Sequence, residues 1–149
     1  MNRAVHDSPI GFARTPAPRL TRLARIAGWT GVAAITILSL VPESERPHSG
    51  LPGQAEHFAA YACTGLALSL AYLGLRERLA FWFGLATASG AFEILQIWIP
   101  GRDAKIQDAF ASTAGLTTGL LIGATLAAQI LAELPVKNPE KQSKGQADK

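Results

Sequence analysis

The chain has 149 residues, of which 48% are hydrophobic and only 17% charged, and its mean hydropathy is +0.18. Because soluble domains carry about 25% charged residues, this composition argues against an ordinary soluble protein. The net charge of +3 comes from basic residues that flank apolar segments, and no nucleic-acid-binding motif accompanies them, so we expect no nucleic-acid partner. The single cysteine, Cys63, excludes an intramolecular disulfide.

Four apolar blocks follow one another, separated by short segments rich in proline, glycine or charge. They cover residues 26–41, 58–75, 79–99 and 106–134. A membrane-spanning helix needs about 20 mainly apolar residues, and these blocks are close to that length. The first is the shortest, but Arg22 and Arg25 could extend their charged ends toward water, which would let its helix begin near Leu20. The sequence therefore predicts an all-α fold, an integral membrane four-helix bundle.

A cleaved signal peptide is the alternative interpretation of the first block. The residues before Pro42, Ser39-Leu40-Val41, lack the small-x-small pattern of a cleavage site. The preceding basic segment is also long for a signal, so we favour a retained helix.

The segments outside the blocks define the domain organisation. Residues 1–25 form a basic arm, 26–134 the membrane domain and 135–149 a polar tail. Between the blocks, residues 42–55 contain three prolines and two glycines and read as a loop. We also predict a tight polar turn at Arg76-Glu77-Arg78 and a short loop over 100–105.

Basic residues indicate the orientation of the bundle. With a cytoplasmic N-terminus, eleven of the 14 Lys and Arg residues lie on the inner side and three on the outer side. The positive-inside rule therefore predicts that both termini are cytoplasmic, so that the arm and the tail are too. Trp29, Tyr72 and Trp82 would lie near the inner helix ends and Trp98 near the outer end of the third helix, as in an aromatic belt.

A stripe of small residues marks the fourth block. Gly115, Gly119 and Gly123 recur at four-residue spacing after Ala111, so they share one helix face. Small residues on such a face allow another helix to approach closely, and we interpret the stripe as a packing surface.

Glu93 lies within the third apolar block, where a carboxylate is costly to bury. Gln96 follows three residues later on the same helix face. Pro100-Gly101 would leave Arg102 free to fold back toward Glu93. A Glu93–Arg102 pair that only fixes helix packing and a chemical role for Glu93 are both open interpretations.

The remaining unusual polar residues map to the same outer helix ends. Taken singly, His57 is an ordinary interfacial histidine, Tyr61 a core or belt residue, and Asp108 a charge that stabilises a helix dipole. Their joint occurrence on one membrane face indicates a single site. Its members are His57, Tyr61, Glu93, Gln96, Arg102, Asp108 and Ser112.

A family resemblance rests on these residues. The C-terminal half of the VanZ-like membrane proteins is similar to the series Glu93-x-x-Gln96, Pro100-Gly101-Arg102, Asp108 and Gly115, and their earlier His-x-x-x-Tyr is similar to His57-x-x-x-Tyr61. The resemblance covers about residues 42–125. It implies a small helical protein of a bacterial inner membrane. One family member is linked to low-level teicoplanin resistance, and we do not transfer that property from resemblance alone.

Two positions depart from the family pattern. Gly53-Gln54 stands where the family usually has Asp-Lys, and Ser112 stands where it has an asparagine. Any mechanism that depends on that Asp-Lys pair or on that amide is therefore not carried over to this chain.

Three functions stay open at this point. The leading expectation is a site on the outer face that binds or modifies a lipid headgroup or cell-envelope precursor, with Arg102 holding an anionic group. In it, Glu93 would orient Arg102 or contact the ligand, and Tyr61, Gln96, Asp108 and Ser112 would add polar contacts. The second is a membrane-embedded enzyme with Glu93 and His57 as acid and base. The third is a structural or partner-binding protein. The spacing of histidines and cysteines shows no metal-ligand pattern, and we expect neither a metal nor a cofactor.

Overall fold

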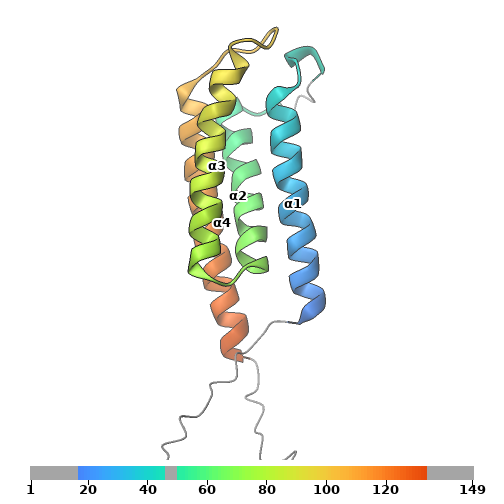
Figure 1. Ribbon diagram of the computed structural model, residues 1–149, viewed down its shortest axis with the longest axis vertical. Helices are drawn as coiled ribbons and strands as arrows, with labels where there is room; N and C mark the ends of the chain where they lie inside the picture. Colours follow the sequence, from blue (N-terminus) through green and yellow to red (C-terminus); the bar gives the residue numbers. More distant parts are fainter. Residues whose placement is uncertain (1–16, 46–49, 134–149) are drawn as a thin grey trace, which may run out of the picture.

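The computed structural model describes residues 17–45 and 50–133, and within them the chain is helical without strands. Four α-helices run α1 (Pro18–Leu40), α2 (Gly53–Ala71), α3 (Leu75–Gln96) and α4 (Ile106–Glu133), with a short 3-10 helix, η1 (Glu43–Glu45), after α1. The helices stand side by side and alternate in direction (Figure 1). The all-α prediction is therefore confirmed for the described residues.

The two ends of the bundle differ (Figure 1). One carries the α1–α2 and α3–α4 connections, and we call it the loop end; its described connecting residues are 41–45, 50–52 and 97–105. The opposite end carries the start of α1, the short α2–α3 connection and the end of α4. There the Trp29 indole donates to the Tyr72 hydroxyl (3.0 Å), and the Arg25 guanidinium lies 5.3 Å from the centre of the Tyr72 ring.

Helix α1 begins at Pro18, close to the predicted start near Leu20, because proline suits the first helical position and arginine favours helix. The predicted starts of α2 and α3 were too late. Helix α2 begins at Gly53, inside the predicted 42–55 loop, directly after Pro52. Arg76-Glu77-Arg78 is not a turn but the first turn of α3, and the chain reverses just before it, at residues 72–74.

Helices α2 and α3 both end earlier in the structure than their apolar blocks predict. Helix α2 ends at Ala71 rather than near residue 75, and α3 ends at Gln96, three residues before the apolar run does. Helix α4 starts at Ile106 as predicted and is described to Glu133. The arm before residue 17 and the tail from residue 134 lie outside the described residues.

The closest helix contact joins α2 and α4 through small residues. An added Cβ at Gly115 would strike the backbone of Phe58, and one at Gly119 would strike the Ala62 carbonyl. On the facing helix, a Cβ at Gly65 would lie 2.8 Å from the Leu116 carbonyl oxygen. The glycine stripe predicted as a packing surface therefore faces α2, a partner that the sequence alone does not identify.

The bundle buries several polar residues beside a small core of Ile35, Tyr61, Leu116 and Leu120, and it exposes many large apolar side chains. Ser69, Ser89 and Ser112 are buried, and so are Glu93 and Gln96. Large apolar side chains cover the outside of all four helices, among them Leu23, Ile37, Phe58, Phe83, Ile94, Phe110 and Leu121. By length and composition, Pro18–Leu40 and Ile106–Glu133 are each able to cross a membrane. Helices α2 and α3 are not among the spans that meet this test.

Candidate functional site

The loop end is organised by the turn between α3 and α4. Pro100 and Gly101 occupy its centre, the Arg102 N–H donates to the Ile99 carbonyl (3.2 Å), and Gly101 has φ of +76°. A proline followed by a residue with positive φ is the signature of a type II turn, for which glycine is the residue best suited. The turn directs Arg102 back toward the bundle, as the Pro-Gly pair predicts.

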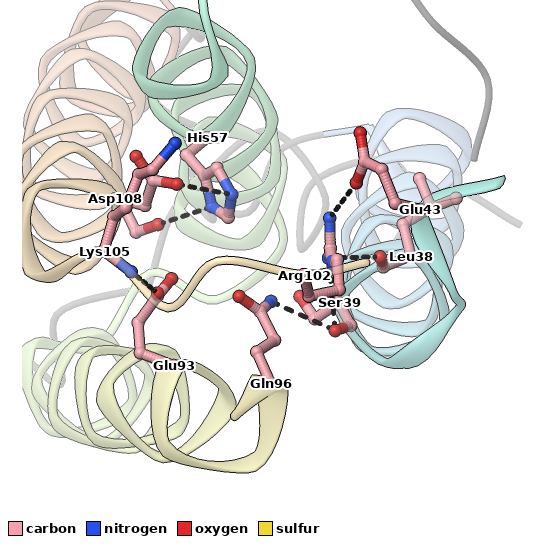
Figure 2. Close-up of polar contacts among 10 residues, drawn as sticks. Leu38, Ser39, Glu43, His57, Glu93, Gln96, Arg102, Lys105 and Asp108 are labelled. Carbon is pink, nitrogen blue, oxygen red and sulfur yellow. Dashed lines mark hydrogen bonds and ion pairs between the residues drawn. The ribbon is translucent and has the colours of Figure 1, made fainter. Parts of the chain in front are cut away.

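Arg102 ends on α1 and not on α3. Its guanidinium donates to the Leu38 carbonyl (2.9 Å) and the Ser39 carbonyl (3.2 Å), and it pairs with the Glu43 carboxylate at 3.1 Å (Figure 2). The last carbonyls of a helix have no donor within the helix, so Arg102 supplies what the end of α1 lacks. The Glu93–Arg102 pair considered from sequence is therefore wrong in its partner: Arg102 pairs with Glu43.

Gln96 has the same function at the end of α1. Its side-chain amide is 3% exposed and donates to the Ser39 carbonyl at 3.0 Å. Gln96 and Arg102 thus hold α1 against the end of α3 and the following turn. The Gln96 amide and both terminal nitrogens of Arg102 already donate inside the protein, which weakens the expectation that Arg102 clamps an anionic ligand, and the Arg102 Nε atom is buried without a hydrogen-bond partner.

A second cluster joins α2, α3 and α4. His57 from α2, Glu93 from α3 and Asp108 from α4 each place one nitrogen or oxygen atom within 4.8 Å of the other two. The His57 Nε2 atom is 3.8 Å from Asp108 Oδ2, and Glu93 Oε2 accepts the Lys105 backbone N–H at 2.8 Å (Figure 2). The sequence predicted that these residues share one end of the bundle. It did not reveal this group, because its members come from three separate helices.

Hydroxyl groups extend this cluster into the core. The Ser112 Oγ atom lies 3.2 Å from His57 Nδ1, and Ser112 has no exposed surface. Tyr61 is 2% exposed, and its side chain hydrogen-bonds with Ser89 and Ser112. The polar chain thus runs from Asp108 through His57 and Ser112 to Tyr61. Ser89 had no sequence signal, since a serine in an apolar helix is common.

A groove opens between α1 and α2 beside the cluster. It has a volume of about 410 Å³ and an apolar floor and walls, with polar groups at the loop end. Its polar lining comes from Glu56, His57, Tyr61, Thr64, Ser39 and Arg102, and its remaining lining from Gly31, Ala34, Ile35, Leu38, Ala60 and Cys63. Sequence reasoning missed Glu56 as a lining residue, and it missed the α1 wall altogether.

The site residues predicted from sequence thus fall into two groups. Gln96 and Arg102 secure α1, whereas His57, Glu93, Asp108, Ser112 and Tyr61 form the polar cluster. Comparison with protein-family models, with curated proteins and with solved structures gives no match.

Proposed function

We propose that the chain is a small VanZ-like integral membrane protein whose α1–α2 groove binds a lipid or a lipid-linked envelope precursor. The groove carries this proposal, because its volume of about 410 Å³ lies in the range of small-molecule sites. Its apolar walls suit a hydrocarbon chain. Its polar end offers an acceptor in Glu56 and donors in His57 and Tyr61, which suits a headgroup.

The distribution of side chains supports a membrane environment for all four helices. A water-soluble bundle buries its large apolar side chains, whereas here Phe83, Ile94 and Leu121 are about 60% exposed. Where α2 and α4 meet, glycines let the two backbones approach closely, as in helix packing within bilayers, and Leu68, Leu116 and Leu120 are buried as well. Helices α2 and α3 have 19 and 22 residues, so at about 1.5 Å per residue each is long enough to cross the hydrocarbon core.

The proposed orientation follows from both ends of the bundle. The start of α1 and the end of α4 lie at the same end (Figure 1), so the described N- and C-terminal helices leave the bundle on one side. The surplus of basic residues at that end assigns it to the cytoplasm of a bacterial inner membrane. The loop end, with the groove opening and the polar cluster, then faces outward.

Reporter fusions test this orientation. We expect a reporter at the C-terminus to be active in the cytoplasm and one inserted after Gly50 to be active only outside it. A C-terminal reporter that is active only outside the cytoplasm would contradict the proposal.

Filling the groove should remove its ligand. Ala60 and Ala34 line the groove, so Ala60→Phe and Ala34→Phe should place a ring in the space that the hydrocarbon chain would occupy. We expect native mass spectrometry of protein purified in mild detergent to show bound lipid on the wild type and about tenfold less on either variant.

Neighbouring positions provide the matched controls. Ala59 and Ala33 are exposed but do not line the groove, so Ala59→Phe and Ala33→Phe should retain the lipid. Equal lipid occupancy in all four variants would contradict the groove as the binding site. A wild-type protein without bound lipid would favour the structural alternative instead.

An enzymatic function is the second candidate, and the proximity of His57 and Glu93 favours it. Their nitrogen and oxygen atoms lie within 4.8 Å, so an acid–base pair could form there. If the site is catalytic, mass spectrometry should show that the wild type converts its lipid while Glu93→Gln retains it unchanged. Identical lipid masses in both proteins would exclude this role for Glu93.

A further inference from the structure

The polar cluster contains two carboxylates that face one histidine, and in the part of the chain that the structure describes no lysine or arginine side chain forms an ion pair with either of them. Glu93 is 8% exposed, and its one described hydrogen bond comes from the Lys105 backbone. Asp108 faces His57 at 3.8 Å, and its second oxygen, Oδ1, is buried without a hydrogen-bond partner. Arg102 pairs instead with Glu43.

Local features of the protein offset only part of this charge. The N-terminus of α4 lies beside both carboxylates and contributes the equivalent of about half a positive charge. If the His57 imidazole is protonated it can neutralise one carboxylate, and the other then keeps its charge. Buried carboxylates in proteins are paired, protonated or bound to metal ions, and one bound cation would satisfy both of these carboxylates at once.

We propose that His57, Glu93 and Asp108 bind a divalent transition-metal ion at the loop end. The three donors come from α2, α3 and α4, and one atom of each lies within 4.8 Å of the other two. Ligands about 2.1 Å from a tetrahedral ion stand roughly 3.4 Å apart. A contraction of at most about 1.4 Å between donor atoms, which side-chain rotation can supply, therefore completes the site.

The surroundings of His57 fit a ligand role. Its Nε2 atom points toward Asp108, and its Nδ1 atom lies 3.2 Å from the buried Ser112 Oγ. A metal on Nε2 requires a proton on Nδ1, which would then donate to Ser112. Metal-bound histidines usually donate their second N–H in this way, and that partner fixes the ring orientation. The unpartnered Asp108 Oδ1 also has a use here, as a second or alternative ligand atom.

The donor set indicates the class of metal. One imidazole with two carboxylates suits Zn²⁺, Mn²⁺ or Fe²⁺, whereas Mg²⁺ and Ca²⁺ prefer oxygen ligands alone. Three protein ligands also leave at least one position for water or another small ligand, as in catalytic rather than structural metal sites. His57 lines the groove and is shared by the two proposals, whereas Glu93 and Asp108 do not line it, so changes at these two carboxylates test metal binding apart from lipid binding.

Cobalt titration tests the site directly. The full chain, purified in detergent, is treated with EDTA, freed of chelator and titrated with Co²⁺, whose visible bands are strong in four-coordinate sites and weak in water. We expect saturation at one ion per chain and displacement by Zn²⁺. His57→Ala, Glu93→Gln and Asp108→Asn should each lose the strong bands. Ser112→Ala should weaken affinity by about tenfold or more.

Matched controls separate the site from a general loss of acidic charge. Asp103→Asn removes an exposed carboxylate of the α3–α4 loop that is outside the trio, so it should bind Co²⁺ as the wild type does. Glu93→Gln keeps the side-chain shape and removes the buried charge. In EDTA its melting temperature should therefore equal or exceed that of the wild type, while Co²⁺ should raise the melting temperature of the wild type only.

The contrary result is equally clear. If the wild type shows only the weak bands of hydrated Co²⁺ and no change in melting temperature, the metal site is overturned. The same holds if Glu93→Gln binds Co²⁺ as well as the wild type does. Lipid occupancy in the groove variants is measured separately, so either proposal can fail while the other stands.

Discussion

Gly119→Ala is expected to destabilise the bundle by about 3 kcal/mol, the upper end of the usual cost of overpacking. The added methyl group would lie well inside van der Waals contact with the Ala62 carbonyl and 2.9 Å from the Leu66 nitrogen. Because both neighbours are backbone atoms of α2, neither can rotate away as a side chain would. Helices α2 and α4 would have to separate along the seam that also includes Gly115 and Gly123.

Thermal unfolding of the purified protein in detergent measures this effect. Gly84→Ala is the control, because no atom lies within 4 Å of a Cβ at that exposed position of α3. Replacing a helical glycine with alanine there should be neutral or stabilise by up to about 1 kcal/mol. If Gly119→Ala and Gly84→Ala have the same melting temperature, α2 and α4 are not packed through their glycines. Gly119→Leu should be more severe still.

Arg102→Gln should cost about 3 kcal/mol, through the loss of α1 contacts. The wild-type guanidinium is 6% exposed and serves two α1 carbonyls and one carboxylate. Without it, the Leu38 carbonyl loses its side-chain donor, the Ser39 carbonyl keeps only the Gln96 amide, and the contact with Glu43 is lost; an unsatisfied group costs roughly 1–3 kcal/mol. Glu43 is 41% exposed, so Glu43→Gln should cost less than about 1 kcal/mol.

Double-mutant cycles identify the partner of Arg102. We expect Arg102→Gln and Glu43→Gln to show measurable coupling, since the two side chains are in contact. Arg102→Gln combined with Glu93→Gln should be close to additive. Strong coupling in the second cycle and none in the first would show that Arg102 pairs with Glu93. It would contradict the contacts of Arg102 with the end of α1.

The sequence was informative where apolar length decides the structure. It placed four helices, the start of α4 and the glycine face correctly, since these depend on hydropathy and on four-residue periodicity. It failed at the start of α3, because arginine and glutamate form good helices although they interrupt an apolar run. The hydropathy block therefore begins later than the helix that contains it.

The sequence predicted which end of the bundle holds the site, but it did not predict which residues contact each other there. Offsets of three and four residues put Glu93 and Gln96 on one face, and the alternation of the helices put them near His57 and Asp108. The choice of partners depends on how far each side chain reaches across helices. Arg102 passes Glu93 and reaches the end of α1, and no spacing within the sequence encodes that distance.

The cap on α1 also orders events during synthesis. Leu38 and Ser39 leave the ribosome long before Gln96 and Arg102. The hydrogen bonds that hold the end of α1 can therefore form only after α3 and the following turn have been made. The seam of α2 likewise waits for α4, which is the last helix made. Packing can begin between α1 and α2, where Gly28 and Gly31 lie against Leu68 and Thr64, but it is completed only when the C-terminal half has been made. A nascent chain stalled before residue 96 would hold α1 against α2 without the Gln96 and Arg102 contacts and without α4, and quality-control proteases should recognise such a chain as incomplete.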